Sequence, residues 1–191
     1  MSAGSAPQPE SLSAESWAQG QQLIEFLRQL VGRLAQALPA TTEVVLHDLS
    51  LLPNSIVAIA GGVTDRTVGD PATDVLLRQL RSGENAVVGY PTDLPGGREG
   101  RSTTMIMRLP TGEAVAALCL NADISQWRSA SKLLDSLLGG RAGANPLSDD
   151  VVQAEMPSAA GQSGEAFVRS VDELAATLID REIASSPFRS S

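Results

Sequence analysis

The sequence has few of the residues that several common kinds of site require. It contains one cysteine and one histidine, and only 3% of its residues are aromatic. A single cysteine cannot form a disulfide within the chain, which fits a reducing cytoplasm. One cysteine with one histidine also falls short of the three or four nitrogen and sulfur ligands of a usual zinc site. We therefore expect a cytoplasmic protein with no internal disulfide, no metal centre and no cofactor.

Positive charge is scarce as well. The chain has 14 Lys and Arg residues against 22 Asp and Glu residues, a net charge of −8. Proteins bind nucleic acids largely by neutralising phosphates, and anionic membrane surfaces likewise attract basic patches. No run approaches the roughly 18 apolar residues that indicate a membrane span. We expect direct binding neither to nucleic acid nor to a membrane.

The sequence has enough hydrophobic residues to form the core of one folded domain. Hydrophobic residues make up 42% of the 191 residues and charged residues 19%, which argues against a wholly disordered chain. Changes in composition divide it into a disordered tail (1–15), a folded domain (16–140), a Gly, Ala, Ser and Pro-rich linker (141–164), a helix (165–184) and a second tail (185–191).

Apolar periodicity predicts the elements of the folded domain. Leucines recur at helical spacing between Leu23 and Leu38, with Ser16 and Gln19 as a capping box and Pro39 as the end. A second helix is expected to begin at Pro71, with Asp70 as its cap, and to end at Gly83. The remaining predictions are strands at 43–49, 55–60, 85–90, 102–109 and 114–121, a loop at 91–100 and a helix at 124–138.

The order of these elements predicts the fold class. Short connections make the last three strands antiparallel. Two strands, a helical middle and a three-strand meander are the order of a PAS-type sensor domain, in the α+β class. We expect a five-stranded antiparallel sheet that packs its helices on one side, holds a small ligand between, and carries amphipathic helices at both ends of the chain.

Four blocks of sequence resemble a known family in the same order and spacing. They are EVVLHDLS (43–50) with SIVAIAGG (55–62), VTDRTVGDPATD (63–74), REGRSTTMIMR (98–108) and ALCLNADIS (117–125). Over roughly residues 21–138 the chain is similar to the YheO-like PAS domain family. The resemblance implies a bacterial transcription regulator, whose sensor domain is followed by a linker and a helix-turn-helix. Regulators of D-amino-acid use belong to this family.

The chain departs from the family pattern in two places. Gly61-Gly62-Val63 lacks the asparagine that usually follows the second strand and is one residue shorter. The segment 170–186 resembles the connecting helix before the helix-turn-helix, but 165–191 holds three basic against five acidic residues. We therefore expect no DNA-binding domain, and action through a homodimer or a mixed dimer with a full-length regulator.

Polar residues within the resembling blocks are the candidate site. The predicted ligand-binding residues are His47, Asp48, Arg66, Asp70, Tyr90, Arg101, Ser102, Thr103, Cys119 and Asn121. Strand alternation points His47 and Asp48 to opposite faces, so both can enter one pocket only at a bulge. Arg66 and Asp70 either pair with each other or bind the two ends of a zwitterion such as an amino acid. The predicted ligand is a small polar metabolite.

Two alternatives to a sensor stay open. A structural protein-interaction module would have a solid core and no ligand, whereas a cavity lined by polar groups favours the sensor. An enzyme could use His47 to activate Cys119, which requires a thiolate and a base within hydrogen-bond reach. A cysteine within ALCL is more often a small core residue, so we expect no catalytic residues and no enzyme.

Overall fold

The computed structural model describes residues 14–138, 165 and 167–185, so the predicted linker and most of both tails lie outside the described residues. Its elements are α1 (Ala14–Ala37), β1 (Thr42–Asp48), the 3-10 turn η1 (Leu49–Leu51), β2 (Ile56–Ala60), α2 (Asp74–Ser82), β3 (Ala86–Leu94), β4 (Arg98–Arg108), β5 (Ala114–Asp123), α3 (Ser125–Leu137) and α4 (Val171–Ser185).

The strands form one sheet in the order β2-β1-β5-β4-β3. Every neighbouring pair is antiparallel, and β1 and β5 lie at the centre. The predicted α+β class and the five-stranded antiparallel sheet are therefore confirmed. Because the first and last strands of the domain pair at the centre, residues distant in sequence come together there.

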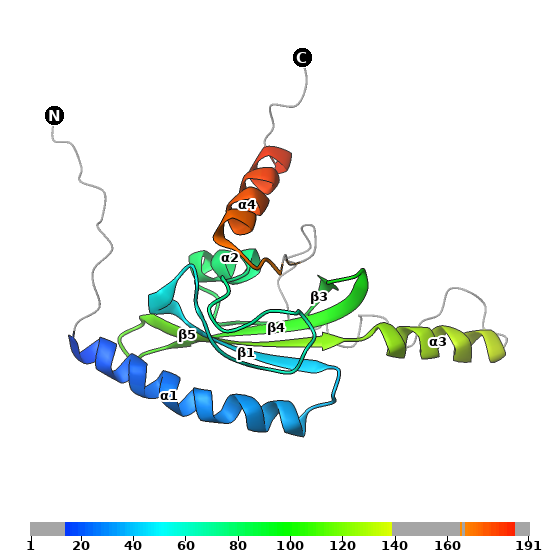
Figure 1. Ribbon diagram of the computed structural model, residues 1–191, viewed down its shortest axis with the longest axis horizontal. Helices are drawn as coiled ribbons and strands as arrows, with labels where there is room; N and C mark the ends of the chain where they lie inside the picture. Colours follow the sequence, from blue (N-terminus) through cyan, green and yellow to red (C-terminus); the bar gives the residue numbers. More distant parts are fainter. Residues whose placement is uncertain (1–13, 139–164, 166, 186–191) are drawn as a thin grey trace, which may run out of the picture.

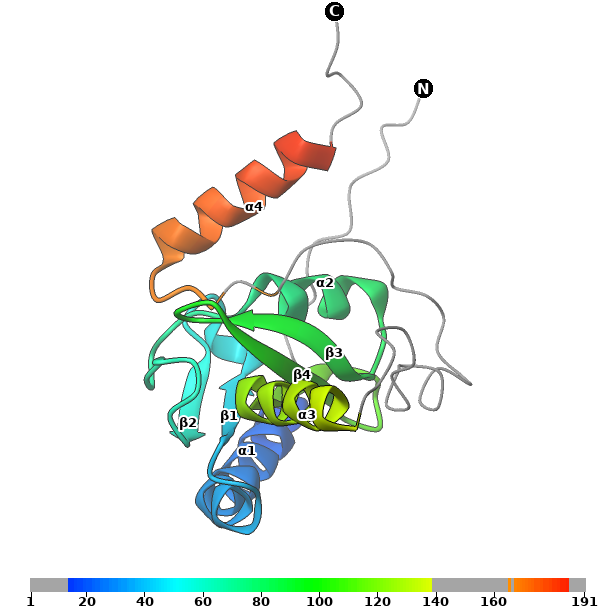
Figure 2. The same cartoon turned by 90° about the vertical axis from the view of Figure 1, so that its right-hand side faces the viewer.

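Helices cover both faces of this sheet, contrary to the one-sided packing predicted. The α1 helix runs along one face, and α2 and α4 lie on the opposite side (Figure 1; Figure 2). On the α1 face, Val44 and Leu46 of β1 pack with Ile24 and Val31 of the helix. All seven residues of β1 are buried, as a strand covered on both faces requires.

Two predicted helix starts are wrong. Ser16 lies inside α1 rather than at its cap, and Gln19 Nε2 donates to Glu15 Oε1 at 3.4 Å. The α2 helix begins at Asp74, because Thr73 is its cap and the Thr73 hydroxyl accepts from the Leu76 amide at 3.3 Å. The predicted end at Gly83, in a left-handed conformation with φ +78°, is confirmed.

The β3–β4 hairpin is longer than predicted. Residues 91–94 and 98–100 belong to strands, so most of the predicted loop 91–100 is sheet. Gly100 makes this pairing possible, because a Cβ atom there would lie 2.7 Å from side-chain carbons of both Thr92 and Leu94. The sequence pattern predicts that Gly100 belongs to a loop, whereas in the structure it permits close packing within the sheet.

The C-terminal helix also begins later than predicted. The α4 helix starts at Val171, whereas Glu165, Phe167 and Val168 are not helical. Glu165 and Val168 are buried, and α4 contacts α2. An ion pair between Arg181 of α4 and Asp74 of α2 joins the two helices. The chain before α4 therefore enters the domain instead of continuing the helix.

Candidate functional site

The face of the sheet toward α2 carries a layer of polar side chains, all of them buried except the half-buried Tyr90. Alternation along the strands places on this face Glu43 and His47 of β1, Cys119 and Asn121 of β5, Ser102 and Thr104 of β4, and Tyr90 and Thr92 of β3. Buried polar groups need hydrogen-bond partners, so the partners of this layer show what it is built to hold.

Glu43 anchors one end of the layer. Its carboxylate accepts from the amides of Val63 and Thr64 at 3.0 and 3.1 Å, and from the Thr64 hydroxyl at 2.5 Å. Asn121 Nδ2 donates to it at 3.2 Å, and Asn121 Oδ1 accepts from the Ser102 hydroxyl at 2.9 Å. With four donors, Glu43 fixes the loop that follows β2, and this loop carries Arg66.

Glu165 occupies the other end of the layer. Its Oε1 accepts from the Thr73 hydroxyl at 2.7 Å, and its Oε2 accepts from the Tyr90 and Thr92 hydroxyls at 2.9 and 3.4 Å. We call these three hydroxyls, from α2 and β3, the carboxylate cradle. Burial raises the pKa of Glu165, and the Thr73 hydrogen bond and Arg66 oppose this rise.

Two nitrogen-bearing side chains lie beside the cradle. Arg66 is buried, donates from Nε to the Thr64 hydroxyl at 3.3 Å, and holds its guanidinium 5.0 Å from the Phe167 ring centroid. His47 Nδ1 lies 2.8 Å from Ser55 Oγ. Arg66 Nη1 and His47 Nε2 have no hydrogen-bond partner among residues 14–138, 165 and 167–185.

The charges of these groups are set by burial. Burial and, secondarily, the positive charge of Arg66 lower the pKa of His47 to about 3, so its imidazole is neutral at physiological pH. Burial and then the carboxylate of Glu165 raise the pKa of Cys119 to about 12. Cys119 Sγ lies 3.5 Å from Thr104 Oγ1, whereas His47 pairs with Ser55. A protonated thiol that contacts a threonine hydroxyl, with the imidazole neutral and paired to a serine, is not an activated nucleophile.

The structure brings six of the ten predicted site residues together. His47, Tyr90, Ser102, Cys119 and Asn121 share the α2 face, and the loop carrying Arg66 lies beside it. Their ligand contacts stay a prediction, but their common location is what one pocket requires.

The other four residues lie elsewhere. Arg101 and Thr103 alternate onto the opposite face, where Thr103 Oγ1 accepts from the Gly89 amide at 3.0 Å. Asp48 also faces α1, because it alternates with His47 along the regular β1–β5 pairing, and Gln21 of α1 donates to it. Asp70 accepts from the Thr67 amide at 2.8 Å within its own turn and does not belong to the strand face. One ligand cannot contact all ten residues.

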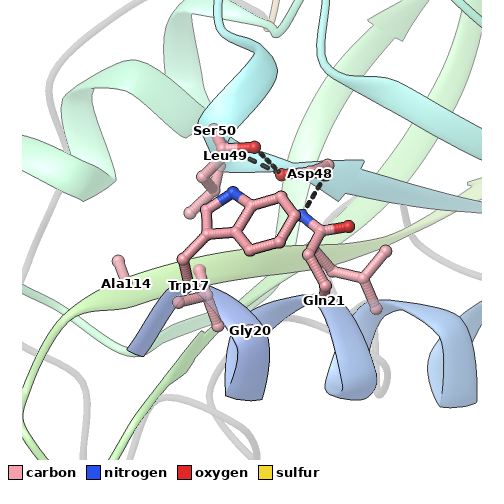
Figure 3. Close-up of a pocket in the computed structure, with 9 residues that line it drawn as sticks. Trp17, Gly20, Gln21, Asp48, Leu49, Ser50 and Ala114 are labelled. Carbon is pink, nitrogen blue, oxygen red and sulfur yellow. Dashed lines mark hydrogen bonds between the residues drawn. The ribbon is translucent and has the colours of Figure 1, made fainter. Parts of the chain in front are cut away.

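Asp48 instead borders a small pocket between the start of α1 and η1, with Trp17, Gly20 and Ala114 (Figure 3). Gln21 Nε2 donates to it at 3.2 Å, and the Ser50 amide and hydroxyl donate at 2.9 and 2.6 Å. The pocket measures about 100 Å³. Small-molecule sites usually exceed roughly 300 Å³, so this pocket is smaller than an ordinary ligand site.

Glu43, Thr73, Thr92, Thr104 and Glu165 belong to the site but are not among the residues predicted from the sequence. Alternation along β4 signals Thr104, since it shares a face with Ser102. No local signal identifies Glu165, because its partner Thr73 lies 92 residues away in the sequence. Across the described ranges, no three His, Cys, Asp or Glu residues form a group that could hold a metal ion. Within the same ranges, no helix is long and apolar enough to cross a membrane.

The sheet order and the helical segment between β2 and β3 define a PAS-type domain. Residues 18–139 match the model of the YheO-like PAS domain, and the chain belongs to this family. The predicted resemblance is therefore confirmed, and with it membership in a family of transcription-regulator type.

Three relatives show how far the similarity extends. An uncharacterised protein of Haemophilus influenzae is 32% identical over 54% of this chain and 48% of its own length. The transcriptional regulator DauR of Pseudomonas aeruginosa is 30% identical over 60% of this chain and 54% of its own length. The uncharacterised protein YheO of Escherichia coli K12 is 31% identical over 53% of this chain and 45% of its own length. The aligned segment spans about half the length of these relatives.

Among solved structures, an RNA-binding light-oxygen-voltage receptor aligns with 71% of this chain and 41% of its own, at 12% identity and a TM-score of 0.39.

Proposed function

We propose that this chain is a ligand-sensing PAS-like domain of a transcription-regulator family, and that it binds a small polar metabolite on the α2 face. The buried polar layer carries this proposal. A structural interaction module has no need for a carboxylate cradle, a buried guanidinium and a neutral imidazole within one domain, since apolar packing stabilises a core at lower desolvation cost.

The response to ligand is proposed to pass through helix packing and dimerisation. A ligand shifts an equilibrium only when it binds one arrangement more tightly than the other. The α3 helix extends from the end of β5 (Figure 1), and Trp127, Leu134 and Leu137 on it are 67%, 57% and 73% exposed. A second copy of this chain, or a full-length regulator with the same domain, would cover these side chains. The partner in a mixed dimer would supply DNA binding, since the net charge of −8 disfavours it here.

A thermal-shift screen tests ligand binding. The full chain is heated with amino acids of both hands, small carboxylates, purines and polyamines. A ligand at 100 times its dissociation constant adds about 2.7 kcal/mol of stability, which is a shift of several degrees for a domain of this size. We expect a hit that Arg66→Gln abolishes and that Arg33→Gln, on exposed α1 surface, retains. A folded protein without any hit favours the interaction module instead.

Dimerisation is tested by light scattering on a sizing column. We expect twice the monomer mass for the native chain and the monomer mass for Leu134→Glu with Leu137→Glu. Lys132→Glu introduces a negative charge at an exposed position of the same helix and is expected to leave the dimer intact. Transient interfaces typically have micromolar dissociation constants. If the native chain is still monomeric at a protein concentration about 100 times higher, the proposed dimer is contradicted.

A further inference from the structure

The carboxylate cradle is filled by the chain itself. We propose that Glu165 stands in the place of a ligand carboxylate, and that a monocarboxylate ligand binds by displacing Glu165 and thereby releasing α4. This inference rests on the proposed sensor function and adds to it the chemical class of the ligand and the element that responds.

The cradle is suited to a single carboxylate. Thr73, Tyr90 and Thr92 supply three hydroxyl donors to the two carboxylate oxygens, at 2.7, 2.9 and 3.4 Å. Tyr90 has a second hydroxyl partner, Thr104 Oγ1 at 3.0 Å, which orients its ring. The buried guanidinium of Arg66 lies against Phe167, two residues after Glu165, and the three hydroxyl donors meet two oxygens, which matches a carboxylate better than the three oxygens of a phosphate.

Glu165 leaves part of the polar layer unsatisfied. Arg66 is 5% exposed and His47 is 0% exposed, yet Arg66 Nη1 and His47 Nε2 lack hydrogen-bond partners among the described residues. The Arg66 guanidinium lies 5.0 Å from the ring centroid of Phe167, two residues after Glu165, and His47 shares the α2 face with the Tyr90 and Thr92 hydroxyls of the cradle. A ligand with a carboxylate and a second polar group can satisfy atoms that Glu165 cannot reach, and this gives it an advantage over the internal occupant.

The cradle is connected to α4 by a short, packed segment. Phe167 lies against the Arg66 guanidinium, and Val168 is 7% exposed. Val171 then begins α4, where Leu174 is buried and Arg181 pairs with Asp74 of α2. Displacing Glu165 removes the N-terminal attachment of this segment. The occupant of the cradle and the docking of α4 are then thermodynamically linked, each affecting the other by the same factor.

The test compares the full native chain with Glu165→Ala, using Asp180→Ala as a matched control at an exposed position of α4. Amide hydrogen exchange reports on residues 171–182 and on α1. Propionate, which copies the glutamate side chain beyond its Cα, is the probe, and propionamide is its uncharged counterpart. Glu165→Gln provides a second variant that keeps the size of the side chain if the alanine variant does not fold.

We expect exchange in α4 to rise about tenfold or more in Glu165→Ala, while α1 and the Asp180→Ala variant stay unchanged. Propionate should bind Glu165→Ala roughly tenfold more tightly than the native chain, because the native cradle is open only part of the time. In the native chain, excess propionate should raise α4 exchange, and propionamide should not.

Unchanged α4 exchange in Glu165→Ala, or equal propionate affinities in the two proteins, overturns the inference. If either result accompanies a hit in the thermal screen, sensing stands and only the displacement by carboxylate is wrong. If propionate displaces Glu165 but no metabolite shifts the native chain, the displacement stands and the sensor function is wrong.

Discussion

The hydroxyl of Tyr90 donates to the carboxylate of Glu165 at 2.9 Å, which joins β3 to a residue 75 positions later in the chain. Tyr90 is the single tyrosine of the sequence. Burial, followed by the charge of Glu165, raises the pKa of Tyr90, so its phenol remains a proton donor. Glu165 is buried and Tyr90 is half-buried, and the bond joins the α2 face to the segment before α4.

A double-mutant cycle measures this bond. Tyr90→Phe is expected to lower the free energy of unfolding by about 1–3 kcal/mol, because it leaves a buried carboxylate oxygen with one donor fewer. Combined with Glu165→Ala, which removes the acceptor, the two changes should show a coupling of about 0.5–3 kcal/mol in urea titrations at neutral pH. Effects that simply add would show that the two side chains do not interact in solution.

The docking of α4 is expected to depend on pH through Glu165. Since burial raises the pKa of the docked carboxyl, docking takes up a proton. Docking is therefore strongest below about pH 4.3, the pKa of an exposed glutamate, and weakens as pH rises through the raised value. The ionisable groups that act on Glu165 or are acted on by it are Arg66, Tyr90 and Cys119, and the raised pKa values of Tyr90 and Cys119 keep both protonated in this range.

The measurement is α4 amide exchange between pH 4.5 and 7.5, corrected for intrinsic rates and divided by α1 exchange. The corrected ratio should rise with pH in the native chain. Glu165→Gln cannot ionise, so its ratio should be flat. A slope that is the same in both proteins would assign the pH dependence to another group.

Global stability is expected to change in the opposite direction through His47. Burial and Arg66 lower its pKa to about 3, so the folded state binds fewer protons than the unfolded state. The stabilising contribution is complete above about pH 6.5 and is lost as pH falls toward 3, by up to about 1.4 kcal/mol per pH unit. Urea titrations at pH 7.0, 5.5 and 4.5 measure it. His47→Asn should remove this part of the pH dependence, and identical profiles would disprove it.

The thiol of Cys119 is expected to be unreactive in the folded protein. Its pKa of about 12 and its buried position leave almost no thiolate at pH 8. A disulfide reagent should therefore label no thiol within minutes, and one thiol per chain after unfolding in guanidinium. Rapid labelling of the folded chain would revive the enzyme alternative, in which His47 activates Cys119.

Replacing Gly61 is expected to destabilise the fold much more than replacing Gly62. At Gly61, φ is +107°, and an added Cβ would lie 2.7 Å from Glu43 Cα and Thr42 O. Gly61→Ala should cost about 2 kcal/mol or more of unfolding free energy, because the strain and the backbone contact add. Gly62 has open space around its Cβ position, so Gly62→Ala should change stability by less than about 1 kcal/mol. Equal effects in thermal unfolding would contradict this account.

Local patterns predicted most of the sheet and failed at several boundaries. Strand alternation correctly placed His47 and Asp48 on opposite faces, because successive side chains of a strand must point in opposite directions. The predicted start of α2 at Pro71 was wrong because Asp70 does not cap this helix. The Asp70 carboxylate accepts from the Thr67 amide within the preceding turn, and the Thr73 hydroxyl caps the helix through the Leu76 amide.

The sequence by itself determined the elements, their order and the family, since these depend on periodicity and on motifs within short stretches of chain. Only the tertiary structure decided what completes the candidate site. The apolar pattern of 165–184 predicts one helix, but α4 begins only at Val171. Glu165 is instead bound by the hydroxyls of Thr73, Tyr90 and Thr92, so it is not part of the helix. Contacts across more than 70 positions leave no local trace, because each partner alone is an ordinary polar residue.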